Sequence, residues 1–100
     1  MGMESGKKSL DILFLDVGQG DSAIIQFENG KTMLVDAGQR NWSRDYGEKV
    51  VIPSARYLGV KRFNWVVMTH PHSDHIGGLV SVLEAVPVDT VWDIFSEYGS

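Results

Sequence analysis

All three histidines of this 100-residue chain lie within six consecutive residues, His70-Pro71-His72-Ser73-Asp74-His75, and this cluster limits how the middle of the chain can fold. With Asp74 they supply four potential metal ligands at positions i, i+2, i+4 and i+5. A regular helix or strand would point some of these side chains away from the others, because it places successive residues on different faces. The segment is therefore predicted to be a loop that folds around one point.

The residue types in this cluster favour binding of divalent metal ions. Imidazole suits zinc and similar ions, and a carboxylate balances part of their charge. In an extended segment His70 and His72 project to the same side and can reach one ion. Asp74 and His75 follow where the chain turns, and are better placed for a second ion about 3.5–4 Å away. An inert solvated loop and a pH-sensitive contact are the alternatives.

Apolar runs and turn residues predict an α+β fold with a mixed sheet and helices on one face. Asn29-Gly30 is typical of a hairpin turn, Pro53 of a first helical turn, and Gly59 of the left-handed residue that ends a helix. Val51, Ala55 and Leu58 share one helical face. The predicted elements are strands 10–17, 22–27 and 32–36, a helix 50–58, a strand 62–68, a helix 77–86 and a strand 90–95.

A sheet with helices on only one face leaves its other face bare, and exposed apolar area of that size predicts a partner. We expect either a homodimer or a missing C-terminal half to cover it. The candidates for the bare face are Leu13, Leu15, Val17, Ile24 and Val35. Phe63, Trp65 and Trp92 are predicted to lie in the core.

Charge and composition exclude few functions. The formal charge of −4 argues against a strongly basic nucleic-acid surface, but two bound divalent ions would make the field near a site positive. The absence of cysteine excludes disulfides and thiolate zinc sites. Residues 1–8 are predicted to be a disordered tail, and 9–100 to fold. No apolar run in this chain approaches the roughly 20 residues that span a bilayer, no signal peptide is evident, and the compartment is not indicated.

The H-x-H-x-D-H spacing, followed by Ile76-Gly77-Gly78-Leu79, resembles the metallo-β-lactamase superfamily of hydrolases. The strand that ends in Thr69 and the Leu34-to-Gly38 segment resemble the same family. The LDVGQGD string at 15–21 is particularly similar to the branch related to the DNA-uptake competence protein ComEC. The resemblance implies a four-layer αββα sandwich, of which residues 9–100 are the N-terminal half.

By the same resemblance, His70 and His72 would bind the first metal, and Asp74 and His75 the second. A hydroxide that bridges the ions would attack the substrate, and Asp74 would also relay a proton. Zinc is the expected metal and manganese the alternative. Oxygen-reducing di-iron members carry Glu at the position of His72, so this histidine favours a hydrolase.

Two carboxylates outside the cluster are predicted to support it. Asp36 resembles a position that orients a ligand histidine through its free ring N–H, and the alternative is an Asp that caps a strand end. Asp21 would lie at the rim of the site or cap its own turn. Gly77 and Gly78 would allow either close approach of a substrate or steric fit. Thr69 is interpreted as a strand-end residue.

The family completes its site with a further His, a bridging Asp and a last His, and no His follows His75 in this chain. The metal site is therefore incomplete in these 100 residues. The first hypothesis is a metal-dependent hydrolase domain whose substrate is a phosphodiester such as DNA. The alternative is a non-catalytic half-domain that acts by assembly with a partner. Trp42, Arg40 and Arg44 form a candidate stacking loop for nucleic acid, or a packing anchor.

Overall fold

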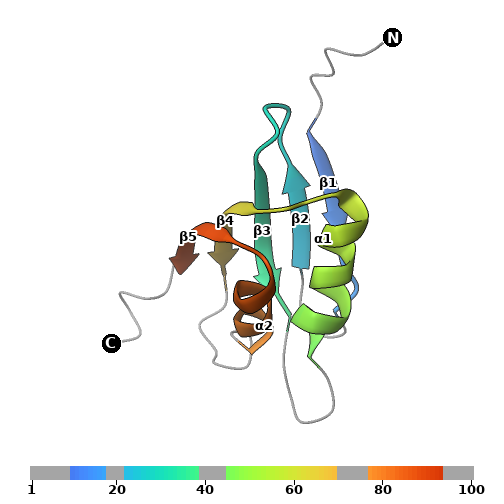
Figure 1. The fold of residues 1–100 in the computed structure, drawn as a ribbon, viewed down its shortest axis with the longest axis vertical. Coiled ribbons are helices and arrows are strands. Elements are labelled where there is room, and N and C mark those ends of the chain that lie inside the picture. Colours follow the sequence, from blue (N-terminus) through green and yellow to red (C-terminus); the bar gives the residue numbers. More distant parts are fainter. Residues whose placement is uncertain (1–9, 18–21, 39–44, 70–76, 94–100) are drawn as a thin grey trace.

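The computed structural model describes residues 10–17, 22–38, 45–69 and 77–93. Five strands form one mixed sheet whose order, β1-β2-β3-β4-β5, follows the chain (Figure 1). β1 to β3 are antiparallel neighbours, whereas β3, β4 and β5 are parallel. The elements are β1 (Asp11–Phe14), β2 (Ser22–Gln26), β3 (Thr32–Ala37), a π-helical turn η1 (Gly47–Val51), α1 (Ile52–Leu58), β4 (Phe63–Met68), α2 (Gly77–Ala85) and β5 (Val88–Asp93).

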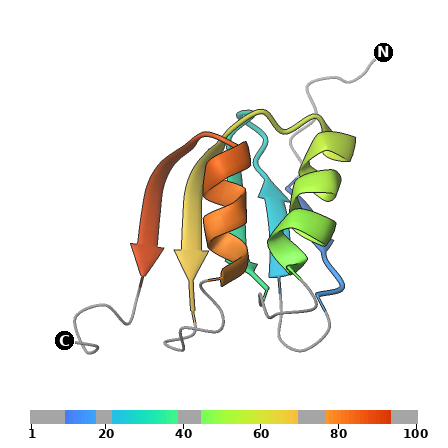
Figure 2. The same cartoon turned by 60° about the horizontal axis from the view of Figure 1, so that its bottom comes forward.

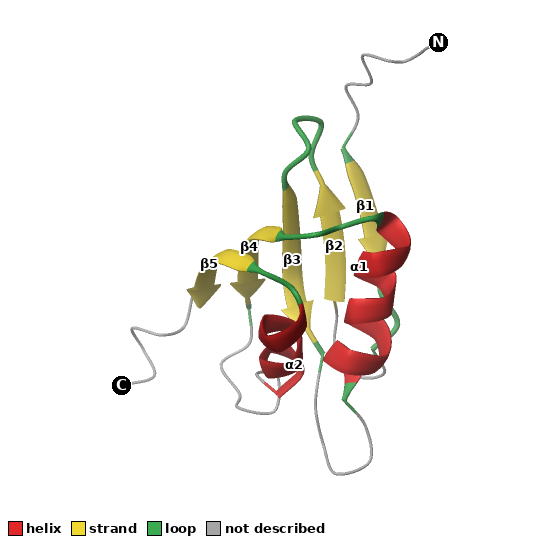
Figure 3. Cartoon of the chain, in the orientation of Figure 1, coloured by secondary structure: helices red, strands yellow, loops and turns green. Residues whose placement is uncertain are grey.

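Both helices cover the same face of the sheet, with the strands forming a single layer behind them (Figure 2). Colouring by secondary structure shows that the connection from α1 to β4 crosses one end of the sheet (Figure 3). The α+β prediction, with a mixed sheet and helices on one face, is confirmed. None of the helices within the described ranges is long and apolar enough to cross a lipid bilayer.

The hairpin turn and the two ends of the first helix have the residues and conformations that the sequence predicts. Gly30 has φ 87° in the β2–β3 hairpin, and the Asn29 side chain accepts a hydrogen bond from the Lys31 amide at 3.0 Å. Pro53 stands in the first turn of α1, and Gly59 ends this helix at φ 77°. The helical winding begins at Gly47, before the predicted start, because a π-helical turn precedes α1.

The core fills the space between the sheet and the helices. Ile24, Leu34 and Val66 occupy matching register positions on three adjacent strands and are fully buried. Val51 and Ala55 pack onto them with no exposed surface, and the predicted apolar face of α1 is confirmed. Phe63 is also fully buried, as predicted.

The opposite face of the sheet carries apolar side chains, and no helix of the described residues covers it. Phe14 is 78% exposed, Ile12 47% and Trp92 52%. The register places Phe14, Ala23, Val35, Val67 and Trp92 in one row across all five strands. We call this surface the open face; its exposed residues are Ile12, Phe14 and Trp92, and its half-buried ones Ile25, Met33, Val35, Trp65 and Val67.

Several predicted positions are wrong. Of the five candidates for the bare face, Val35 alone lies there. Ile24 is fully buried in the core, Leu13 pairs with Ile24, Leu15 packs against the core, and Val17 is 1% exposed. In residues 10–17 both the odd-numbered and the even-numbered positions include apolar side chains, so the alternation of a strand could not show which side chains face the core. Trp65 and Trp92 are not core residues, because Trp65 is half-buried on the open face and Trp92 lies on β5, at the edge of the sheet.

Candidate metal centre

The four predicted metal ligands, His70, His72, Asp74 and His75, lie outside the described residues, as does Asp21. The described chain ends at Thr69 on one side of this segment and resumes at Gly77 on the other. In the four described ranges, no group of three or more His, Cys, Asp or Glu could hold a metal ion. The geometry of the candidate centre is therefore defined by its two flanks.

The carboxylate of Asp36 holds the residue immediately before His70. Its Oδ1 accepts a hydrogen bond from the Thr69 backbone amide at 2.8 Å, and its Oδ2 accepts one from the Thr69 hydroxyl at 2.5 Å. Asp36 is 3% exposed, and two hydrogen bonds to one carboxylate fix geometry as well as adding energy. The contact ties the end of β3 to the end of β4, its parallel neighbour.

The backbone of Asp36 bends to make this contact. Its φ of 54° is in the left-handed region, where a residue with a Cβ typically loses about 1–2 kcal/mol. The hydroxyl of Ser22 donates a hydrogen bond to the Asp36 carbonyl at 2.6 Å, and Ser22 is 2% exposed. A buried carbonyl needs such a donor. Ser22, at the start of β2, therefore supports the bend.

The start of α2 fixes the other flank through close backbone contact. A Cβ added at Gly78 would lie 2.3 Å from the Ala37 carbonyl oxygen and 2.6 Å from that of Gly38. A Cβ added at Gly47 would lie 2.0 Å from the Gly78 carbonyl oxygen. Glycine is required at both positions because real Cβ contacts do not approach so closely. The N-terminal turn of α2 thus packs directly on the end of β3.

Asp45 adds a second link to α2. Its Oδ2 accepts a hydrogen bond from the Ser81 hydroxyl, and its Oδ1 accepts one from the Glu48 amide at 3.1 Å. The same carboxylate therefore holds the beginning of η1 and the middle of α2 together. This link fixes the position of the helix whose first turn follows the histidine segment.

The described residues on either side of segment 70–76, Thr69 and Gly78, consequently contact one short piece of chain, Asp36 to Gly38. We call this piece the β3 anchor. It lies where parallel strands β3 and β4 end, and the space beyond the carboxyl ends of parallel strands is where such sheets commonly bind ligands. The described frame thus brings the two ends of a seven-residue segment, 70–76, to the same edge of the sheet.

The predictions for these flanking residues have different outcomes. The Asp36 carboxylate contacts Thr69, 33 residues away and directly after β4, which agrees with the alternative of an Asp that caps a strand end; its predicted contact with a ligand histidine stays a prediction. At Gly78 the geometry supports steric fit. Trp42, Arg40 and Arg44 lie outside the described residues.

Sequence reasoning missed three contributors and undervalued a fourth. No role was predicted for Ser22, Asp45 or Ser81, because their partners are distant in the sequence. Thr69, interpreted as a strand-end residue, is the anchored residue of the first flank. Its position directly before the first histidine was the available signal.

The sequence profile of the metallo-beta-lactamase superfamily matches residues 15–94 of this chain. The uncharacterized protein YcaI of Escherichia coli is 36% identical over 77% of the chain. ComE operon protein 3 of Bacillus subtilis is 29% identical over 67% of the chain, and Recombination protein 2 of Haemophilus influenzae is 31% identical over 85%. The matches cover 10% of the first two relatives and 11% of the third, so the chain spans about a tenth of their length.

Proposed function

The chain belongs to the metallo-beta-lactamase superfamily, in the branch related to ComEC, and from this premise we propose that it contributes the first metal-binding segment of a phosphodiester hydrolase. The family makes it a hydrolase-like domain; the metal ions, the reaction and the substrate are the proposal. The observation that carries it is the β3 anchor, because Thr69 and Gly78, which flank the H-x-H-x-D-H segment in the described chain, both contact it.

The donor set of this segment fits divalent zinc. It offers three imidazoles and one carboxylate, and the chain contains no competing thiolate. His70 and His72 would hold one ion, and Asp74 and His75 the other. Bound zinc would supply a nucleophile, because it lowers the pKa of water to about 7. Asp74 would also accept or pass on a proton, and Asp36 would fix the start of the segment through Thr69.

A phosphodiester substrate is supported by the relatives. One of them is named Recombination protein 2, which indicates work on nucleic acid. The test is a longer chain with downstream sequence, assayed with zinc or manganese on bis(p-nitrophenyl) phosphate and on single-stranded DNA. Metal-dependent cleavage is the expected result. If neither substrate is cleaved, the non-catalytic half-domain becomes the better account, since no His follows His75 in these 100 residues.

Asp36→Asn is expected to weaken zinc binding or the rate of the longer chain by about 10–100-fold, as is usual for groups that orient metal ligands. An amide keeps the size of the side chain but replaces one acceptor oxygen with a donor, so Thr69 loses one of its two carboxylate contacts. Titration calorimetry with zinc measures the affinity. Glu28→Gln, an exposed change of the same kind in the hairpin, is the matched control. Unchanged affinity together with an unchanged rate in Asp36→Asn would remove the proposed supporting role.

We further propose that the second half of the family domain covers the open face. The face offers an apolar groove of about 420 Å³ between β1, β2 and β3, and relatives extend far beyond the matched region. A bare apolar sheet face of this kind associates in water. The 100-residue chain alone is therefore expected to self-associate through it.

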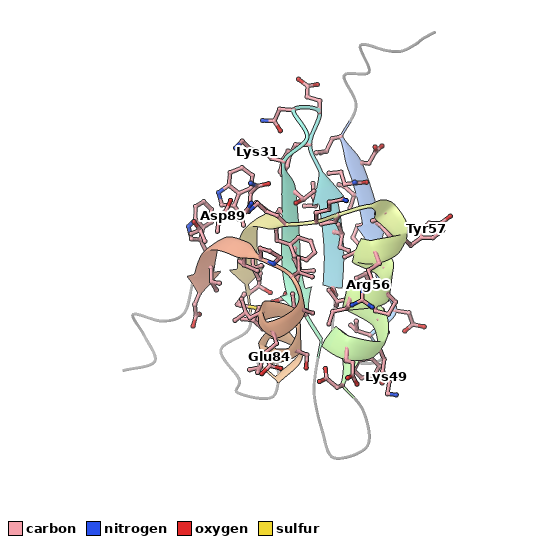
Figure 4. The ribbon with its side chains drawn as sticks, viewed as in Figure 1. Lys31, Lys49, Arg56, Tyr57, Glu84 and Asp89 are labelled. Atoms are coloured by element: carbon pink, nitrogen blue, oxygen red, sulfur yellow. The ribbon has the colours of Figure 1, made fainter. Side chains whose placement is uncertain are left out.

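Phe14→Glu combined with Trp92→Glu should convert the 100-residue chain to a monomer, because both side chains are more than half exposed on the open face. Light scattering across a concentration series measures this. Tyr57→Glu is the control, since Tyr57 is 88% exposed on α1 (Figure 4). In a longer protein with the second half, Phe14→Glu should lower thermal stability instead. If Phe14→Glu instead dissociates a dimer of the longer protein, the open face is covered by a second copy of the protein and not by the second half of the domain.

A further inference from the structure

A polar groove with a positive lining lies at the end of the sheet opposite the histidine segment. It is formed between the β2–β3 hairpin and the connection from α1 to β4, and its volume is about 430 Å³. Lys31, Lys61 and Arg62 line it together with Asn29 and Asn64, and none of its lining residues within the described ranges is acidic. We call it the hairpin groove.

The concentration of positive charge in this groove contrasts with the rest of the molecule. Three of the five Lys and Arg in the described ranges line it, in a chain whose formal charge is −4. The other two, Lys49 and Arg56, project from the helical layer, away from Lys31 at the hairpin (Figure 4). A local cluster of like charges in a concave site raises the local concentration of anions.

The polar groups of the hairpin groove are oriented by contacts outside it. Asp89 on β5 accepts hydrogen bonds from the Arg62 Nε at 2.8 Å and from the Asn64 Nδ2 at 3.1 Å. The Arg62 contact uses one nitrogen of the guanidinium, and the two terminal nitrogens carry the remaining four N–H donors. Asn29 accepts the Lys31 amide through Oδ1, so its NH₂ end is directed elsewhere.

We propose that the hairpin groove binds the phosphate backbone of a nucleic-acid strand at a distance from the histidine segment. Lysine ammonium groups, a guanidinium fork and amide N–H groups are the donors that proteins commonly direct at phosphate oxygens. The inference rests on the proposed phosphodiesterase function and adds a place where the uncut part of the substrate is held.

The spacing suits a strand that reaches both places. Seven residue steps separate Arg62 from Thr69 along β4, which corresponds to about 23 Å at about 3.3 Å per residue. One strand of a duplex carries a phosphate about every 3.4 Å. The groove would therefore hold the strand several phosphates away from the point of cleavage.

The test measures DNA binding by the 100-residue chain in EDTA, with fluorescence anisotropy of a labelled single-stranded oligonucleotide and of the matching duplex. The variant is Lys31→Glu/Lys61→Glu. The control is Lys49→Glu/Arg56→Glu, which changes the net charge by the same amount at exposed helical positions. Circular dichroism verifies that both variants are folded.

The groove variant should bind at least about tenfold more weakly than the control, and the slope of log affinity against log salt should fall by about 1.4 for the single strand, because two phosphate contacts are lost. Equal weakening in both variants would show that net charge alone matters and would overturn the inference, as would absence of binding by the native chain to either DNA. No metal takes part in this assay, so it is independent of whether the longer protein cleaves phosphodiesters.

Discussion

Replacement of His72 by alanine is expected to remove metal and activity together. His72 is one of two imidazoles assigned to the first ion, and an ion held by a single remaining histidine would exchange with water. Changes to groups that merely orient ligands cost about 10–100-fold, so loss of a ligand should cost more than about 100-fold in affinity. Native mass spectrometry with added zinc reports the number of ions on each variant, and activity is measured in the longer chain.

Ser73→Ala is the matched control, because Ser73 lies in the same segment and supplies none of the four assigned ligands. It should keep the native metal content. If His72→Ala kept the native zinc content as well, the assignment of ligands to this segment would be wrong. Loss of metal in both variants would point to disturbance of the segment instead of loss of a ligand.

Gly78→Ala is expected to destabilise the fold by about 2–4 kcal/mol, at or above the usual range for overpacking in a close-packed interior. In a helix without close neighbours, alanine would be favoured over glycine by about 1 kcal/mol. Here its Cβ would lie 2.3 Å from the Ala37 carbonyl oxygen, so backbone would have to move against backbone. For a domain stabilised by about 5–15 kcal/mol, this is a large fraction, and urea unfolding measures it.

The Gly59→Ala variant measures the cost of a left-handed backbone conformation without the cost of a close steric contact. Gly59 has φ 77°, but a Cβ there meets nothing within 4 Å. Alanine should cost only about 1–2 kcal/mol, the usual penalty of a left-handed L-residue. The expected order is thus a larger loss at Gly78 than at Gly59. A neutral or stabilising Gly78→Ala would mean that α2 does not pack on the β3 anchor in solution.

The predictable part of this fold rests on local chemistry. The hairpin at Asn29-Gly30, the end of α1 at Gly59 and the order of strands and helices all follow from residues close together in the sequence. Which side chains of β1 face the core could not be predicted, because apolar residues occur at both odd-numbered and even-numbered positions of this strand. Strand β5 begins at Val88, two residues before the predicted start, because Val88 already pairs with Phe63.

For the candidate site too, the features that depend on neighbouring residues could be predicted, and those that depend on distant residues could not. Residue types and spacing within six positions were enough to nominate the metal ligands. The hydrogen bonds from Thr69 to Asp36 join residues 33 apart, and the close contact of Gly47 with Gly78 joins residues that are also distant in the sequence. No sequence period links such pairs, so only the packed structure could reveal that both flanks of the segment share one anchor.

The strand order of the sheet has a consequence for synthesis. Because β1 to β5 are neighbours in the order in which they are made, each new strand can join the edge left by the previous one as it leaves the ribosome. Asp36 is translated 33 residues before Thr69, a lead of roughly 2–7 s at typical elongation rates of about 5–20 residues per second. The carboxylate that anchors the histidine segment therefore leaves the ribosome, together with β3, before the histidines do.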